Sequence, residues 1–77
     1  MKILCENNKE VRIALAQLEK QGYKWASGHK PTELYQSKDK MIIVFDENKV
    51  NYAITFCESN RGAMRASQLY SNLLRGA

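Results

Sequence analysis

The chain has 77 residues, of which 44% are hydrophobic and 26% charged, with a formal net charge of +4. This length allows one core and one domain, residues 1–77, and the composition is that of a globular protein, which excludes a disordered chain. The longest apolar run, residues 41–45, is far shorter than the roughly 18 residues of a membrane span, and MKILCENNKE turns polar too early for a secretory signal. We therefore expect a cytoplasmic protein with no membrane partner and with Cys5 and Cys57 as reduced thiols; a disulfide between them is the less favoured alternative.

The first expected elements are a strand and a helix. Residues 1–6, MKILCE, predict a short strand. Asn7, with Glu10 three residues later, predicts the capped start of a helix, and Gly22 predicts its end. Between them, apolar residues recur at helical spacing and predict a side that faces the core. These residues are Val11, Ala14, Leu15 and Leu18.

Two short strands are expected next, over residues 23–27 and 33–37, joined by a loop over residues 28–32. Tyr23 and Trp25 lie two positions apart on the first of these strands, so their side chains point the same way. Aromatic pairs of this kind are typical of a core. The alternative is an exposed platform on which nucleic acid bases stack while the surrounding lysines contact phosphates.

The segment MIIVFDENKVNYAITFCE predicts a β-hairpin in which Phe45 pairs with Val50. A shift of one residue would place Asn51 and Thr55 in the core, so this parity is preferred. The face expected to meet the core carries Met41, Ile43, Phe45, Val50, Tyr52, Ile54 and Phe56.

The opposite face of the hairpin is half apolar, since it carries Ile42, Val44 and Ala53 beside Asn51, Thr55 and Cys57. With both helices on the other side of the sheet, its apolar residues, together with Tyr35, would face water. An exposed apolar patch of this kind predicts an interface, including one with a second copy of the chain. The alternative is that the 28–40 loop or the chain ends fold over it.

A last helix is expected from a cap at Ser59 or Asn60 to about Arg75, with apolar positions at helical spacing. Those positions are Ala63, Ala66, Leu69, Tyr70, Leu73 and Leu74. The order along the chain is then β-α-β-β-β-β-α. The expected fold class is α+β, an antiparallel, meander-like sheet with two helices on one face.

The sequence offers little for catalysis. His29 is the only histidine, it falls in an expected loop, and no cysteine lies near it in the sequence. No spacing fits a zinc site, and no glycine-rich phosphate loop is present. We therefore expect no catalytic residue, no metal site and no cofactor, and the protein is interpreted as not an enzyme.

Positive charge gathers in two parts of the chain. Residues 20–40 carry five lysines against two carboxylates, and residues 58–77 carry three arginines against one. Arg61 and Arg65 oppose the dipole of the expected last helix, at about 0.3–1 kcal/mol each. Two explanations stand side by side: the arrangement is retained for a partner, or it is tolerated because Glu58 offsets part of the cost. The candidate partner-binding residues, taken as one positive face, are Lys24, Trp25, His29, Lys30, Tyr35, Lys38, Lys40, Arg61 and Arg65.

The runs LEKQGYKWASG and IIVFDENKVNYAI resemble small α+β proteins encoded by bacteriophages and prophages. Such proteins show a helix that ends in a Gly-Tyr-x-Trp-x-x-Gly turn, followed by a hairpin. Here the motif consists of Gly22, Tyr23, Trp25 and Gly28, and the likeness covers the first two-thirds of the chain. The resemblance implies no catalytic residue. It implies a protein that binds and blocks a host protein, bacterial defence machinery included.

Two interpretations follow from these observations. The leading one is a small phage or mobile-element protein that binds a host protein stoichiometrically in the bacterial cytoplasm, as an anti-defence inhibitor. The expected host protein is acidic or handles nucleic acid. The alternative is direct nucleic-acid binding through a basic and aromatic face.

Overall fold

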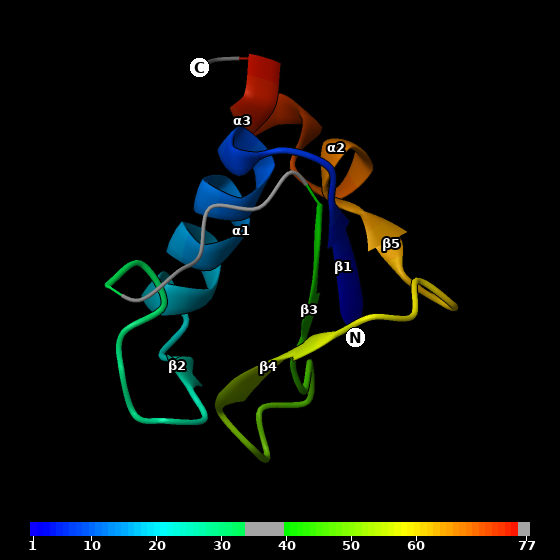
Figure 1. Ribbon diagram of the computed structural model, residues 1–77. Helices are drawn as coiled ribbons and strands as arrows, with labels where there is room; N and C mark the ends of the chain where they lie inside the picture. Colours follow the sequence, from blue (N-terminus) through cyan, green and yellow to red (C-terminus); the bar gives the residue numbers. More distant parts are fainter. Residues whose placement is uncertain (34–39, 76–77) are drawn as a thin grey trace.

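The computed structural model describes residues 1–33 and 40–75. In these residues the chain forms a small α+β fold with a five-stranded mixed sheet and three helices (Figure 1). The elements are β1 (Lys2–Cys5), α1 (Asn8–Lys20), β2 (Lys24–Trp25), β3 (Met41–Val44), β4 (Ala53–Cys57), β5 (Met64–Arg65), α2 (Ala66–Leu69) and α3 (Ser71–Arg75).

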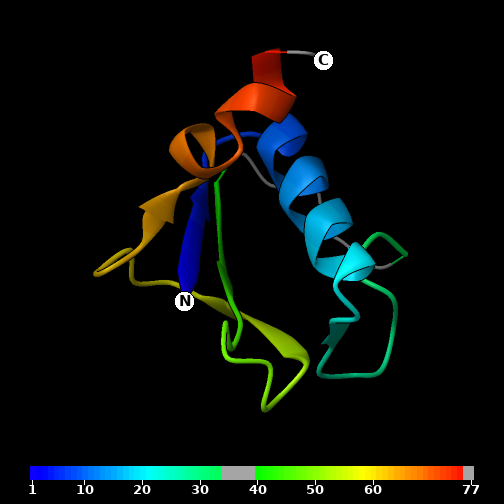
Figure 2. The same ribbon diagram turned by 180° about the vertical axis from the view of Figure 1, so that it is seen from behind.

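The strand order across the sheet is β2-β4-β3-β1-β5. Strand β3 pairs antiparallel with β1 and β4, whereas β5 pairs parallel with β1 and β2 pairs parallel with β4. The α+β class is confirmed, but the antiparallel meander is wrong. Parallel strands need connections that cross the sheet. Helix α1 makes one such crossing, from β1 to β2, and residues 58–63 make the other, from β4 to β5 (Figure 2).

Helix α1 begins and ends as its sequence predicts. The Glu10 amide donates to Oδ1 of Asn7 at 3.0 Å, while the Glu10 carboxylate accepts from the Glu6 amide at 3.1 Å. At the other end Gly22 has a φ of 92°, which suits glycine, and the Tyr23 amide donates to the Leu18 carbonyl at 3.0 Å. The predicted apolar side of the helix is buried.

The core lies between α1 and the sheet, and the aromatic residues after α1 belong to it. Tyr23 is fully buried and Trp25 is 6% exposed. The indole N–H of Trp25 donates to the Pro31 carbonyl at 3.1 Å. Core packing of this pair is thus confirmed, and a base-stacking platform on them is wrong. Strand β2 is shorter than predicted and includes only Lys24 and Trp25.

The second of the short strands predicted between Gly22 and Met41 falls mostly outside the described residues. Of residues 33–37, the structure describes Glu33 alone, which lies in a turn. The loop before it is fixed to α1. The Thr32 hydroxyl donates to the Glu19 carboxylate at 2.6 Å, and the Thr32 amide donates to the same oxygen at 3.3 Å.

The β3–β4 hairpin has the predicted parity in a different register. Ile43 pairs with Phe56 across the two strands. Strand β3 ends at Val44 and β4 begins at Ala53, so the connection between them is longer than predicted. The predicted pairing of Phe45 with Val50 is wrong, and Val50 is 86% exposed. Because the shift is an even number of residues, the side chains within β3 and β4 keep their predicted faces, whereas Val50 and Tyr52, which were predicted to face the core, lie outside both strands and are exposed.

Asp46 explains the longer connection between these strands. Its carboxylate accepts hydrogen bonds from the amides of Asn48, Val50 and Asn51 at 3.0, 3.2 and 3.1 Å. These amides are then engaged by a side chain and do not extend the strand ladder. The Tyr23 hydroxyl also donates to the Asp46 carbonyl, which ties the loop to the core.

The last helix does not start at Ser59 or Asn60. The Ser59 hydroxyl accepts from the Arg61 amide at 3.3 Å, and the Ala63 amide donates to the Asn60 carbonyl at 3.0 Å, so both lie in a turn. Gly62 has a φ of 76°, which no right-handed helix contains. Helical structure begins only at Ala66, and α2 and α3 lie beside the first turn of α1 (Figures 1 and 2).

Candidate binding face of the sheet

One face of the sheet looks away from the helices. Since side chains alternate along a strand, Ile3, Met41 and Ile43 face the core, and the residues next to them face the other way. The strand register aligns the latter in two rows across the sheet. The rows are Leu4, Ile42 and Cys57, and Lys2, Val44 and Thr55.

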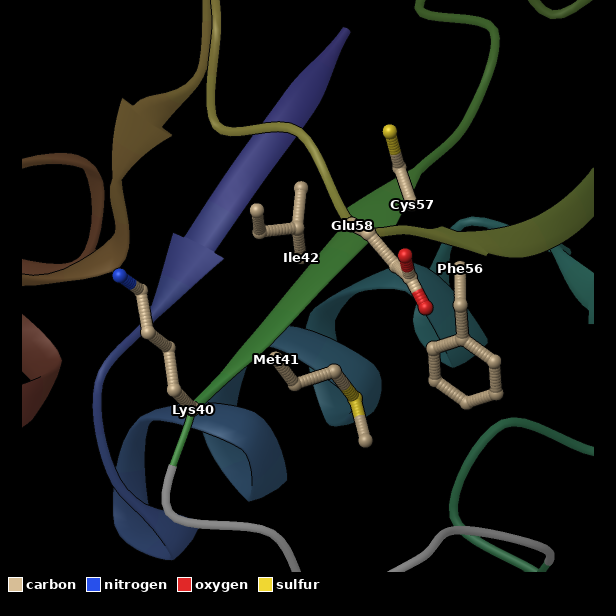
Figure 3. A pocket seen from close by; sticks show the side chains of 6 residues that line it. All are labelled: Lys40, Met41, Ile42, Phe56, Cys57 and Glu58. Carbon is tan, nitrogen blue, oxygen red and sulfur yellow. The ribbon is translucent and has the colours of Figure 1, made fainter.

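The chain itself covers part of this face. Residues 58–63 cross β3 and β1 on the side away from α1 (Figures 1 and 3). Leu4 and Ile42 are only 8% and 5% exposed, although neither belongs to the main core. Val44, Ala53 and Cys57 are half-buried. The half-apolar face is confirmed, but its exposed apolar part is smaller than predicted, because a crossing segment covers Ile42.

Positive side chains surround this apolar centre. Lys24 precedes Trp25, whose ring is in the core, so Lys24 projects to the outer face, and Arg65 does so beside Leu4. The side chain of Lys40 extends on the same side of β3 as Ile42 (Figure 3). We call this surface the basic face, and its cations are Lys2, Lys24, Lys40, Arg61 and Arg65.

Two carboxylates lie near these cations in the described residues: Glu6 on the basic face and Glu58 in the crossing segment. Glu6 lies 3.9 Å from Arg65, between Oε1 and Nε, and both side chains are more than half exposed. An exposed ion pair of this length contributes little to stability. Glu58 is exposed at the start of the crossing segment. The cations are in clear excess.

The structure divides the predicted site residues. Lys24, Lys40, Arg61 and Arg65 lie on the basic face, with Lys24 and Arg65 on the two opposite edge strands of the sheet. Trp25 is buried, so its prediction as a contact residue is wrong. The remaining predicted residues lie elsewhere: His29 and Lys30 are exposed in the loop after β2, and Tyr35 and Lys38 fall outside the described residues.

Lys2 lies on the basic face but is not among the residues that the sequence prediction named. The alternation of side chains in MKILC indicates where Lys2 lies. Ile3 and Cys5 are buried in the core, so Lys2 and Leu4 point to the opposite, outer face of the sheet. Charge counted over whole segments does not reveal a single lysine within an apolar strand.

A cavity of about 460 Å³ opens next to the basic face, at one end of the β3–β4 pair. Phe56 forms one wall. Its ring is 4.7 Å from that of Trp25, and the residue is 49% exposed. The residues around the cavity are Lys40, Met41, Ile42, Phe56, Cys57 and Glu58 (Figure 3).

Reactive side chains do not converge in the part of the chain described. The two free cysteines point to opposite faces of the sheet, and burial, with the nearby charge of Glu10, raises the pKa of Cys5 to about 12. Nδ1 of His29 lies 2.9 Å from the Ser27 hydroxyl in an exposed turn. Within residues 1–33 and 40–75, no three His, Cys, Asp or Glu side chains come together to hold a metal ion, and no helix is long and apolar enough to cross a membrane.

Known proteins offer no direct guide to this site. No family model, curated protein or solved structure matches the chain. The candidate site is therefore interpreted from its own chemistry, which combines an apolar centre, a surrounding set of cations and an adjoining cavity.

Proposed function

We propose that this protein is a non-enzymatic binding protein whose basic face docks on an acidic surface of a partner protein. The observation that carries this proposal is the arrangement of cations around a half-buried apolar centre. Protein interfaces have this anatomy, with an apolar middle and a polar rim, and complementary charge between partners speeds and orients their encounter. The size also fits. A standard interface buries about 800 Å² on each partner, which is a small part of the 5078 Å² of accessible surface of this molecule.

Direct nucleic-acid binding is less well supported. Proteins that bind single strands combine cations with aromatic side chains on which bases stack. Among the described strands, no aromatic residue stands at a position that alternation assigns to the basic face; Trp25 and Phe56 stand at core-facing positions. The middle of the face is apolar instead, at Val44 and Ala53, where a phosphate backbone gains nothing.

Charge also makes this face a poor homodimer interface. In a two-fold dimer the same surface is used by both copies. Two basic faces would bring Lys2, Lys24 and Lys40 of one copy near those of the other, and like charges repel. By the same reasoning, a groove that holds nucleic acid is itself basic and would repel this face. An acidic partner is therefore favoured over one that handles nucleic acid.

The partner we propose is a host protein, with this chain acting as a phage or mobile-element inhibitor of defence machinery in the bacterial cytoplasm. The Gly-Tyr-x-Trp-x-x-Gly resemblance supports this part of the proposal. The structure explains the motif as a fold signature, since Gly22 ends α1 and Trp25 fills the core. The residues that contact the partner lie elsewhere, on the basic face.

Charge reversal tests the proposal. The variant Lys24→Glu/Lys40→Glu changes the basic face, and Lys9→Glu/Lys20→Glu makes the same change in net charge on exposed positions of α1. Each tagged protein is used to capture partners from a bacterial lysate, with and without nuclease, and the captured protein is then purified and its affinity measured at several salt concentrations.

We expect an acidic protein that binds wild type and the α1 variant, survives nuclease, and is lost with the basic-face variant. If capture disappears after nuclease treatment, the protein binds nucleic acid and not an acidic protein. Equal binding by both variants would refute a role for the basic face. Circular dichroism spectra of both variants establish that they are folded.

A further inference from the structure

The connection between β3 and β4 projects from the end of the sheet opposite α2 and α3 (Figures 1 and 2). We call residues 46–52 of this connection the hairpin loop. Its most exposed apolar residue is Val50, at 86%. A single exposed apolar side chain is common on protein surfaces and needs no explanation by itself. What distinguishes Val50 is the way in which the chain holds it there.

The backbone of the hairpin loop is fixed on both sides of the Val50 side chain. The amides of Val50 and Asn51 donate to Oδ2 of Asp46 at 3.2 and 3.1 Å, and the Asn48 amide donates to Oδ1 at 3.0 Å. Lys49 has a φ of 60°, a left-handed conformation that residues other than glycine rarely adopt. Such a conformation persists only where the surrounding structure enforces it. Here the enforced conformation leaves Val50 in water.

The base of the hairpin loop is tied to the core. The Tyr23 hydroxyl donates to the Asp46 carbonyl, and the Lys24 amide donates to the Tyr52 carbonyl at 2.9 Å. The rings of Tyr23 and Tyr52 lie 5.3 Å apart between their centroids. The loop is therefore a fixed projection, and a partner that binds it has little left to order, which lowers the entropic cost of binding. Binding residues are often found on loops that a rigid scaffold positions in this way.

Two cations of the basic face stand where the hairpin loop leaves the sheet. Strand β3 ends at Val44, which pairs with Lys2, and β4 begins with Ala53, which pairs with Lys24. Both lysines project to the outer face, as their alternation with core residues requires. The hairpin loop is thus continuous with the basic face, and an acidic partner that docks on that face also meets the loop.

The carboxylates of the hairpin loop are already engaged. Asp46 accepts the three amide hydrogen bonds, and Oε2 of Glu47 lies 3.0 Å from the ammonium nitrogen of Met1. Lys49 adds an exposed cation. With Lys2 and Lys24 beside the loop, this end of the basic face keeps a positive charge that complements a partner's carboxylates.

We propose that the hairpin loop is the apolar anchor of the interface, with the Val50 side chain inserted into an apolar pocket of the partner protein. Carboxylates at the rim of that pocket then contact Lys2 and Lys24. Insertion is favourable because it removes exposed apolar surface from water. This inference rests on the proposed function and specifies the partner's surface, which has a pocket for one branched side chain with Asp or Glu beside it, and is not uniformly acidic.

The test compares substitutions of two exposed apolar residues. Val50→Thr nearly keeps the shape of the side chain but replaces a methyl group with a hydroxyl group. Leu73→Gln is the control, since Leu73 is an exposed apolar residue on α3, at the opposite end of the molecule (Figure 1). Because both positions are exposed, both variants should keep the Tm of wild type. The probe is the acidic protein that immobilised wild type retains from a nuclease-treated bacterial lysate, and its affinity for each variant is measured by biolayer interferometry at low and at high salt.

We expect Val50→Thr to weaken binding about tenfold or more, because an apolar pocket offers no hydrogen-bond partner to the hydroxyl group. The factor should be the same at low and at high salt. Lys24→Glu should also weaken binding, but its effect should shrink at high salt, since salt screens charge. Leu73→Gln should bind as wild type does.

The outcomes separate the two proposals. If Val50→Thr binds as wild type does while Lys24→Glu loses affinity, the anchor is refuted and the basic face remains the binding surface. Equal losses for Val50→Thr and Leu73→Gln would also refute the anchor, because the effect would not be specific to the hairpin loop. A loss for Val50→Thr with no effect of Lys24→Glu at low salt would contradict the proposed function. If wild type retains no acidic protein, both the proposed function and the inference that rests on it are wrong.

Discussion

Trp25→Phe separates a core role from a contact role for the central residue of the Gly-Tyr-x-Trp-x-x-Gly motif. Phenylalanine keeps an aromatic ring against Phe56 but removes the indole N–H that donates to Pro31 at 3.1 Å. Pro31 is buried, so its carbonyl loses a partner away from water. An unsatisfied buried acceptor costs about 1–3 kcal/mol, before any loss from the smaller ring.

The consequence is large for so small a domain. At about 0.05–0.15 kcal/mol per residue, a chain of this length has a total stability of roughly 4–12 kcal/mol. Each kcal/mol shifts the Tm by about 4–8 °C in a domain of this size. We therefore expect Trp25→Phe to lower the Tm by at least about 4 °C, and by up to about 24 °C.

The assay is thermal unfolding followed by circular dichroism, with Thr55→Ala as an exposed control that leaves the Tm nearly unchanged. Trp25 is the only tryptophan, so its fluorescence adds a second readout. We expect blue-shifted emission that iodide quenches poorly until the protein unfolds. A variant with an unchanged Tm, together with free quenching in the native wild type, would refute the assignment of Trp25 to the core. Folded Trp25→Phe should bind the partner as wild type does.

Three further predictions concern the helix cap, the loop after β3 and the thiols. Asn7→Ala should destabilise the protein by about 0.5–2 kcal/mol in urea unfolding, because the Glu10 amide loses its acceptor, and no change would argue against the cap. Hydrogen bonds from the amides of Asn48, Asn51 and Val50 lower the pKa of the Asp46 carboxyl group in the folded protein. The ionised Asp46 carboxylate therefore stabilises the fold fully at a pH above the pKa that Asp46 has in the unfolded chain. This stabilisation is lost as the pH falls through the lower pKa of the folded protein. Asp46→Ala should thus flatten the loss of Tm at acid pH; an unchanged acid profile would contradict this. In native protein, Ellman's reagent should modify Cys57 first and Cys5 only after unfolding, since burial keeps the thiol of Cys5 protonated, and equal rates would show that β1 is not buried as described.

The sequence predicts best what short-range interactions determine. Helix α1 is set by Asn7, Glu10 and Gly22, which act within a few residues of its ends, and its prediction is confirmed. The faces of β3 and β4 follow from alternation alone and are also correct, although Val50 and Tyr52 lie outside the strands. The register of the hairpin depends on the Asp46 carboxylate, which captures amides up to five residues away, and no apolar pattern encodes that.

The errors at the C-terminal end have a topological cause. The spacing of Ala63, Ala66 and Tyr70 fits a helix, but the chain must first cross from β4 to β5, and residues 58–63 are used for that crossing. The same difficulty affects the site. Charge in the sequence identified Lys24 and Arg65, yet only the strand order shows that they lie on opposite edges of one face.

The position of β1 in the sheet has a consequence for synthesis. It is made before both of its partner strands, yet it lies inside the sheet, where Ile3 pairs with Ile43 on one side and with Met64 on the other. Both partners leave the ribosome much later, so α1 can form early from local contacts while β1 is still unpaired. Such separated pairings give a high contact order and slow folding. A nascent chain that stops before β5 keeps one edge of β1 unpaired and open to association with other strands.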